Sequence, residues 1–272
     1  MVQHMLPRPL SLALALLLIA TATLRAQTQD DVLSARLLPG WRVPDGRYMA
    51  AISLTLAPGW KTYWRAPGEA GIPPVFDWSG SRNLKAVVLH WPAPQVISLN
   101  GMESIGYLDQ LTLPVEVAAM DATRPVDLAL RMDLGICHDI CMPATLDLSA
   151  SLSGPGAPDQ AIAAALKAEP QTGKAAGLVT VGCQLTPIDD GLRVTARLDL
   201  PVQGADETVV FEASEPDIWV SQSVTRREGQ ALTAIADLVP PDGKPFALDR
   251  SGVTVTVLAQ NRAVEIKGCP AP

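Results

Sequence analysis

The stretch VDLALRMDLGICHDICMPATLDLSASL, residues 126–152, decides the fold class. From Val126 to Leu134 apolar residues alternate with polar or small ones, and the alternation resumes from Ala144 to Leu152. A repeat of two residues is typical of a strand with one buried face. The pattern therefore predicts two strands, with Cys137 and Cys141 in the connection between them. We expect this connection to be held by the sheet without being buried inside it, a common place for functional residues.

The rest of the chain also has the pattern of short strands, which predicts an all-β fold. Strands are expected over 48–56, 87–89, 111–117, 178–185, 192–200, 208–212, 231–238, 253–259 and 263–267. Frequent prolines in the first half exclude long helices there. A short helix is expected from Asp159, as N-cap, to Glu169. We therefore predict a first β-sandwich domain over 27–153, a linker over 154–177 and a second β-sandwich domain over 178–272.

The N-terminus predicts export. Arg8 precedes an apolar run from Leu10 to Ala22, and small residues allow cleavage after Ala26. We expect residues 1–26 to be a signal peptide, with an uncleaved membrane anchor as the alternative. No later apolar run is comparable, so the mature protein should be soluble, without stable membrane insertion. In an oxidising compartment, its four cysteines predict two disulfides.

The charge balance excludes two classes of partner. The formal net charge of the whole chain is −7, with 21 basic and 28 acidic residues. Removing residues 1–26 takes away Arg8 and Arg25 and no acidic residue, so the charge becomes −9. A chain this acidic is not expected to bind nucleic acid or an anionic membrane surface.

Cys137 and Cys141 are open to several interpretations. A structural disulfide is one, but the loop it would close is too small to add much chain-entropy stabilisation. A tight ring in a turn is more easily reduced, which favours thiol:disulfide exchange. His138 beside Cys137 could favour a thiolate when protonated, whereas Asp133 and Asp139 would oppose it.

Two further interpretations use the same thiols. With His138, Met142 or Met102 nearby, the pair would suit a soft ion such as Cu(I), whereas zinc would need four ligands. A cysteine hydrolase would need a base, for which His90 and His138 are the candidates. No other feature of the sequence supports a hydrolase.

Cys183 and Cys269 favour a structural disulfide. Cys183 shares strand parity with Val181 and Leu185, so its side chain should point inward, and Cys269 follows the last expected strand. A bond between them would close a loop of more than eighty residues. Closure of so long a loop stabilises a fold by on the order of 4 kcal/mol in the entropy model.

Four of the six tryptophans lie within residues 60–91. Core and turn packing is the expected role of Trp60, Trp78 and Trp91. Trp64 and Arg65 lie among glycines and prolines, and we expect them to line a partner surface.

Three sequence blocks together resemble a known family. They are GWKTYW at 59–64 with PG at 67–68 and GIP at 71–73, NGMESIGY at 100–107 running into LTLPV at 111–115, and GICHDICMPA at 135–144. The combination resembles the N-terminal periplasmic domain of DsbD-type thiol:disulfide interchange proteins, especially the copper-tolerance branch called ScsB. The resemblance covers roughly residues 30–152, and the ScsB-like branch continues through the second domain.

This resemblance implies a fold and a set of site residues. The fold would be an immunoglobulin-like sandwich, here two of them joined by the short helical linker. Cys141 would form the mixed disulfide, and Cys137 would be the resolving partner. A cap over the pair would fall on Ser98 to Tyr107. Its candidate residues are Leu99, Met102 and Tyr107, with Leu99 or Met102 as the shielding side chain.

The resemblance also implies partners and a compartment. The protein would act in the periplasm without a cofactor, taking electrons from a membrane-embedded or thioredoxin-like donor and passing them to oxidised client proteins. DsbD itself spaces its N-terminal pair more widely, and this chain lacks a Cys-x-x-Cys motif. We therefore expect a separate membrane reductase as donor. The alternative functions are Cu(I) binding or copper tolerance through the same cysteines, and a non-catalytic β-sandwich adaptor.

Overall fold

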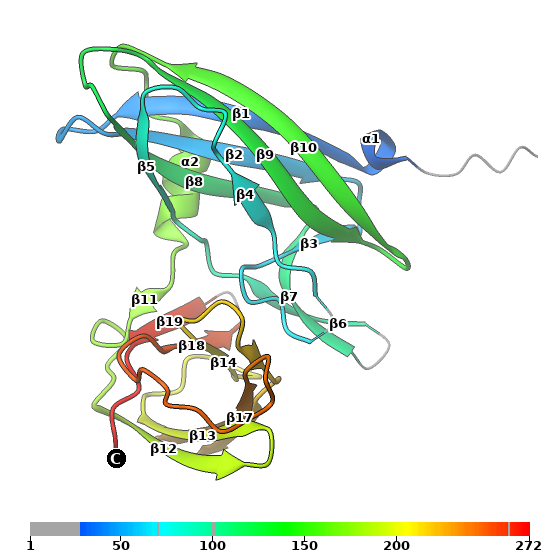
Figure 1. Ribbon diagram of the computed structural model, residues 1–272, viewed down its shortest axis with the longest axis vertical. Helices are drawn as coiled ribbons and strands as arrows, with labels where there is room; N and C mark the ends of the chain where they lie inside the picture. The colour runs from blue at the N-terminus through cyan, green and yellow to red at the C-terminus, as the bar shows by residue number, and fades with distance from the viewer. Residues whose placement is uncertain (1–27, 70, 100–101, 261) are drawn as a thin grey trace, which may run out of the picture.

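The computed structural model describes residues 28–69, 71–99, 102–260 and 262–272 (Figure 1). The expected signal peptide therefore lies outside the described residues. Neither helix in the described part of the chain is long and apolar enough to cross a membrane.

Two antiparallel sheets form the first β-sandwich, which follows the four-residue helix α1 (Gln29–Val32). One sheet has the order β1 (Leu33–Arg42), β2 (Tyr48–Leu56), β8 (Gln110–Ala119), β5 (Leu84–Leu89). The other has the order β10 (Cys141–Leu152), β9 (Val126–Cys137), β3 (Lys61–Tyr63), β7 (Met102–Leu108), β6 (Gln95–Leu99), with β4 (Val75–Asp77) also paired to β9.

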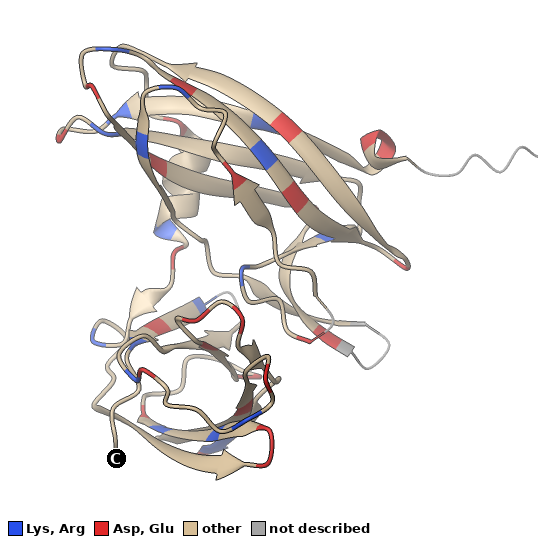
Figure 2. Ribbon diagram, viewed as in Figure 1, with Lys and Arg blue, Asp and Glu red and all other residues tan. Residues whose placement is uncertain are grey.

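The alternating stretch at 126–152 forms the longest pair of strands in this sandwich. Val126, Leu128 and Leu130 are buried in the core, together with Met132 and Leu134. Charged residues recur between them along β9 and β10, on the outward face of the sheet (Figure 2). The sequence period of two thus places one face of the hairpin in the core and the other in solvent.

A second β-sandwich follows along the chain. One of its sheets has the order β11 (Gln171–Thr172), β19 (Arg262–Lys267), β18 (Thr254–Ala259), β14 (Thr208–Glu212). The other has the order β12 (Thr180–Ile188), β13 (Gly191–Asp199), β17 (Ala231–Val239), β15 (Trp219–Val220), with β16 (Val224–Glu228) also paired to β17. Cys183 and Cys269 are buried and form a disulfide across 86 residues, which ties the last part of the chain to β12.

The helix α2 (Gln160–Lys167) joins the two sandwiches and is packed against the first. Asp159 caps it by accepting hydrogen bonds from the backbone N–H groups of Ala161 and Ile162. Ile162 is buried against Met49 and Ala51 of β2. The connector therefore covers the outer face of this sheet, which explains why β2 is buried on both faces.

The structure confirms the predicted fold class, because its four sheets form two β-sandwiches with a short helix between them. The sandwiches also contact each other. Leu258 and Ala263 of the second belong to the apolar core of the first, and Val210 packs against it. Arg65, which follows β3, pairs with Glu212 on β14 and Glu265 on β19.

Candidate redox site

Cys137 and Cys141 form a disulfide at the tip of the β9–β10 hairpin. Cys137 is the last residue of β9 and Cys141 the first of β10, and they face each other with their Cα atoms 4.1 Å apart. The turn between them, residues 138–140, is exposed, and the His138 N–H donates to the Ile140 carbonyl. The prediction that both cysteines lie in the connection between the strands was wrong, because strand pairing continues up to the cysteines themselves.

The two cysteines differ in their exposure to solvent. Cys137 is completely buried and its neighbours Gly135 and Ile136 are also buried, whereas Cys141 is exposed. The expectation of an unburied pair is therefore wrong for Cys137. Because exchange requires a thiolate to approach one sulfur in line with the S–S bond, an incoming thiolate meets Cys141. The sulfur of Cys137 would then be the leaving group.

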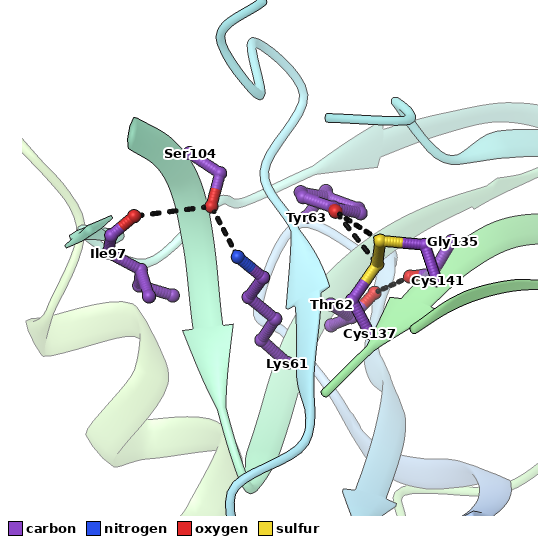
Figure 3. Close-up of a disulfide and its surroundings, with 8 residues drawn as sticks. All are labelled: Lys61, Thr62, Tyr63, Ile97, Ser104, Gly135, Cys137 and Cys141. Carbon is purple, nitrogen blue, oxygen red and sulfur yellow. Dashed lines mark hydrogen bonds between the residues drawn. A yellow bond between two sulfur atoms is a disulfide. The ribbon is translucent and has the colours of Figure 1, made fainter. Parts of the chain in front are cut away.

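Tyr63 on β3 supplies a hydrogen-bond donor to this disulfide (Figure 3). Its hydroxyl oxygen lies 2.8 Å from the Cys137 sulfur and 3.5 Å from the Cys141 sulfur. Disulfide sulfurs carry no hydrogen, so the phenol donates. Tyr63 is only 2% exposed, and burial raises the pKa of its hydroxyl, which keeps the donor proton in place. The sequence pattern does not single out Tyr63, although this residue lies in the GWKTYW block at 59–64.

The local sequence fixes the Tyr63 side chain against the sulfurs. Strand β3 pairs with β9, and in this register Lys61 is the backbone partner of Cys137 and Thr62 that of Ile136. The buried Thr62 hydroxyl donates to the Gly135 carbonyl at 3.0 Å. A Cβ atom on Gly135 would lie 2.9 Å from the Tyr63 ring, so glycine is what allows the ring to reach the disulfide.

Lys61 places a buried cation beside the same tyrosine. It is 8% exposed, and its ammonium donates to the Ser104 hydroxyl on β7 at 2.8 Å (Figure 3). The same nitrogen lies 5.8 Å from the centroid of the Tyr63 ring, within the range of a cation–π contact. Burial lowers the pKa of Lys61.

The first sandwich matches a known protein family. Residues 34–152, which span both sheets of the first sandwich, match the family model described as "Thiol:disulfide interchange protein DsbD, N-terminal". This domain belongs to the DsbD N-terminal family. No curated protein matches the chain.

The fold is shared with a solved structure over both sandwiches. The crystal structure of the N-terminal periplasmic domain of ScsB from Proteus mirabilis is similar with a TM-score of 0.69 at 20% sequence identity. The match covers 91% of this chain and 96% of that chain. At this identity it establishes a common arrangement of the backbone.

The cap expected for a DsbD N-terminal domain falls on the β6–β7 hairpin. Leu99 ends β6 and Met102 begins β7, but their side chains and residues 100–101 lie outside the described part of the chain. Tyr107 is a core residue, because its ring stacks on Trp91 and its hydroxyl donates to the Pro92 carbonyl at 2.7 Å. Burial raises the pKa of Tyr107 far above its ordinary value. The shielding roles remain predictions.

His138 and His90 are held by carboxylates. The His138 Nδ1 atom lies 2.9 Å from an Asp139 oxygen, and its ring lies 6.0 Å from that of Trp60. His90 contacts Glu169, just after α2, at 2.9 Å. Neither contact is to a cysteine, so the described geometry does not assemble the base that a cysteine hydrolase needs.

The Cu(I) interpretation stays a prediction, because one of its candidate ligands, Met102, has a side chain outside the described part of the chain. Nowhere in the described residues do three or more His, Cys, Asp or Glu side chains gather as a metal site, and Met142 packs against the core of the first sandwich. The prediction that Trp64 lines a partner surface was wrong, because Trp64 is completely buried. Trp60 and Trp91 are buried as expected, and Trp78 packs against the same core.

Proposed function

We propose that this protein exchanges disulfides with other proteins of the periplasm through Cys137 and Cys141. The observation that carries the proposal is the asymmetry of the pair. Cys137 is buried with its sulfur beside a phenol donor, whereas Cys141 is an exposed residue at the tip of a hairpin. The match of residues 34–152 to the DsbD N-terminal family supports the same conclusion.

Reduction would begin at Cys141. A donor thiolate attacks the Cys141 sulfur, a new intermolecular disulfide forms, and the bond between Cys141 and Cys137 breaks. The electron pair leaves on the Cys137 sulfur, where the Tyr63 hydroxyl stabilises it before it takes a proton from solvent. A second donor thiolate then attacks the intermolecular bond, leaving an oxidised donor and two reduced cysteines.

Transfer to a client would use the same steps in reverse order. The Cys141 thiolate attacks the client disulfide, and one client sulfur leaves as a thiolate. Cys137 then attacks the mixed disulfide and restores the intramolecular bond, which releases the reduced client. By similarity to the family, the donor would be a membrane-embedded or thioredoxin-like protein, and the client an oxidised periplasmic protein.

Single-cysteine variants test this assignment. Reduced Cys137→Ser should form a stable mixed disulfide with a thioredoxin-like donor whose reactive cysteine is held as a disulfide with thionitrobenzoate. The Cys141 thiolate attacks the donor sulfur, thionitrobenzoate leaves, and peptide mapping should locate the new bond at Cys141. Reduced Cys141→Ser should form little or none, because Cys137 is buried. If Cys141→Ala still passes electrons from donor to client, the proposal is wrong. Peptide mapping also verifies that the Cys183–Cys269 disulfide stays intact in every sample.

A further inference from the structure

A cavity of about 670 Å³, open to solvent on one side, lies where the two sandwiches meet. Cavities of this size at domain interfaces are typical binding sites. Its first wall is the segment that follows β3, together with Glu103 and Ile105 of β7. Its second wall is β14 and the segment leading through β15 to Ser223.

The described lining of this cavity is acidic. Carboxylates come from both sandwiches: Glu69, Glu103, Glu212, Glu215 and Asp217. The cationic residue in the described lining is Arg65, and its guanidinium is already bound to Glu212 at 2.7 Å and to Glu265 at 2.6 Å. A ligand entering the cavity therefore meets uncompensated negative charge.

The same cavity has an exposed aromatic wall. Trp219 on β15 is 51% exposed, and the neighbouring Pro216 adds a rigid apolar surface. Pro67 and Pro73 provide similar surfaces on the first sandwich. An indole face beside carboxylates suits lysine and arginine side chains, which combine a cation–π contact with charge-assisted hydrogen bonds.

The first wall of the cavity continues toward the disulfide. Gly71 and Pro73 line the cavity, and Ile72 between them lies against β9. A Cβ atom on Gly135 would lie 3.0 Å from that of Ile72, and Gly135 is two residues before Cys137. A polypeptide seated in the cavity can therefore extend along this wall to the exposed Cys141. A small cation is too short to reach from the cavity to this cysteine.

We propose that the interdomain cavity binds a basic, extended segment of a partner polypeptide. This partner would be a client of the exchange reaction, and that part of the inference rests on the function proposed above. Binding of the segment itself needs no cysteine chemistry, so docking and exchange are tested separately.

A cysteine-free peptide with alternating lysine and leucine residues, labelled with a dye, is the probe. Fluorescence anisotropy with the full chain should give saturable binding, whereas a peptide with glutamate in place of lysine should not bind. The double variant Glu215→Gln/Asp217→Asn should bind the basic peptide at least tenfold more weakly. Asp189→Asn/Asp190→Asn removes the same charge from the exposed β12–β13 turn and should bind like the wild type. Equal loss in both variants, or no binding to the wild type, overturns the proposal.

Further measurements test where the peptide binds and whether a polypeptide is required. The basic peptide should shift the tryptophan emission of the wild type and not that of Trp219→Phe. Spermidine binding as tightly as the peptide would contradict a polypeptide ligand. Cys137→Ser/Cys141→Ser should retain full peptide binding, so that loss of exchange and loss of docking are distinguished.

Discussion

Cys137 and Cys141 face each other across one hairpin, yet only one of them is exposed. The residue that makes this difference chemically useful is Tyr63, whose hydroxyl donates to the buried sulfur. A leaving thiolate in a dry environment would be costly without such a donor. The buried end of the disulfide thus has a partner for the charge that exchange creates there.

Removing the phenol hydroxyl should slow exchange. A hydrogen bond to a charged group contributes about 1.5–3 kcal/mol. We therefore expect reduction of the 137–141 disulfide in Tyr63→Phe by a small thiol to be about tenfold slower or more, measured by stopped-flow fluorescence. Tyr48→Phe alters a buried tyrosine on β2 and is the matched control, with an unchanged rate. Equal rates in wild type and Tyr63→Phe would exclude a role for the hydroxyl.

The lowered pKa of Lys61 predicts a pH dependence of stability. Burial disfavours its charged form, so the folded pKa lies below the ordinary value of 10.5. Between these two values the unfolded chain binds more protons than the folded one, and stability rises with pH. As pH rises toward 10.5, the free energy of unfolding of the wild type should therefore increase relative to that of Lys61→Met. Urea denaturation at a series of pH values measures this difference.

The control for this titration is Lys267→Met, which removes a lysine whose side chain is 68% exposed. It reports how the rest of the molecule responds to pH. Parallel pH profiles for the wild type and Lys61→Met would contradict the proposed cost of burying the Lys61 charge.

At the scale of elements, the site needs β3 and β9 to approach closely. Gly135 provides the room, because any side chain there would press on the Tyr63 ring and on Ile72. The three-residue strand β3 is held between β9 and β7, so the ring cannot simply move away. The hairpin thus depends on a glycine placed two residues before the buried cysteine.

Gly135→Ala should both destabilise the fold and impair the site. Overpacking of this kind costs about 1–3 kcal/mol in the free energy of unfolding. Displacement of the Tyr63 ring should also slow reduction of the disulfide. Gly80→Ala is the control, because its Cβ would meet Ala129 at 3.3 Å, far from the cysteines in the strand register. If Gly135→Ala keeps wild-type stability and exchange rate, the close approach is unimportant.

The sequence predicted elements well where the pattern is long. The strand expected over 48–56 and the one expected over 208–212 have the bounds of β2 and β14, and Asp159 caps α2. Eight strands in the described part of the chain were not predicted: β1, β3, β4, β6, β7, β11, β15 and β16. Most of them are short, and the longer β1 and β7 lack a sustained alternation, with Pro39 and Gly40 interrupting β1. Tyr63 was missed for a related reason, since its contact with Cys137 spans 74 residues and becomes visible only when β3 and β9 pair.

At the scale of the whole molecule, Arg65 links the two sandwiches. It stacks 4.5 Å above the Trp64 ring and reaches Glu212 and Glu265 on the second sandwich. Burial opposes its charge, but the two carboxylates outweigh that effect and raise the pKa of Arg65. Burial likewise opposes the charge of Glu265, yet hydrogen bonds from Lys267 and Arg65 lower its pKa.

Replacing this arginine should loosen the interface. Arg65→Met leaves the carboxylates of Glu212 and Glu265 without their shared cation. Because these charged groups are partly exposed, we expect a loss of about 1–2 kcal/mol in the free energy of unfolding. Adding Glu265→Gln should recover part of the loss. Arg193→Met breaks the Arg193–Asp237 pair within the second sandwich, where the arginine is half exposed, and should cost less than about 1 kcal/mol. Urea denaturation showing equal losses in Arg65→Met and Arg193→Met would contradict this role.

The central claim is that the Cys137–Cys141 disulfide works in exchange and does not merely staple a hairpin. Its reduction potential tests this most directly, measured by equilibration with a glutathione redox buffer and peptide mapping of both disulfides. We predict a value more positive than about −300 mV for this pair. A value below about −300 mV would mark it as a structural disulfide and contradict the proposed function.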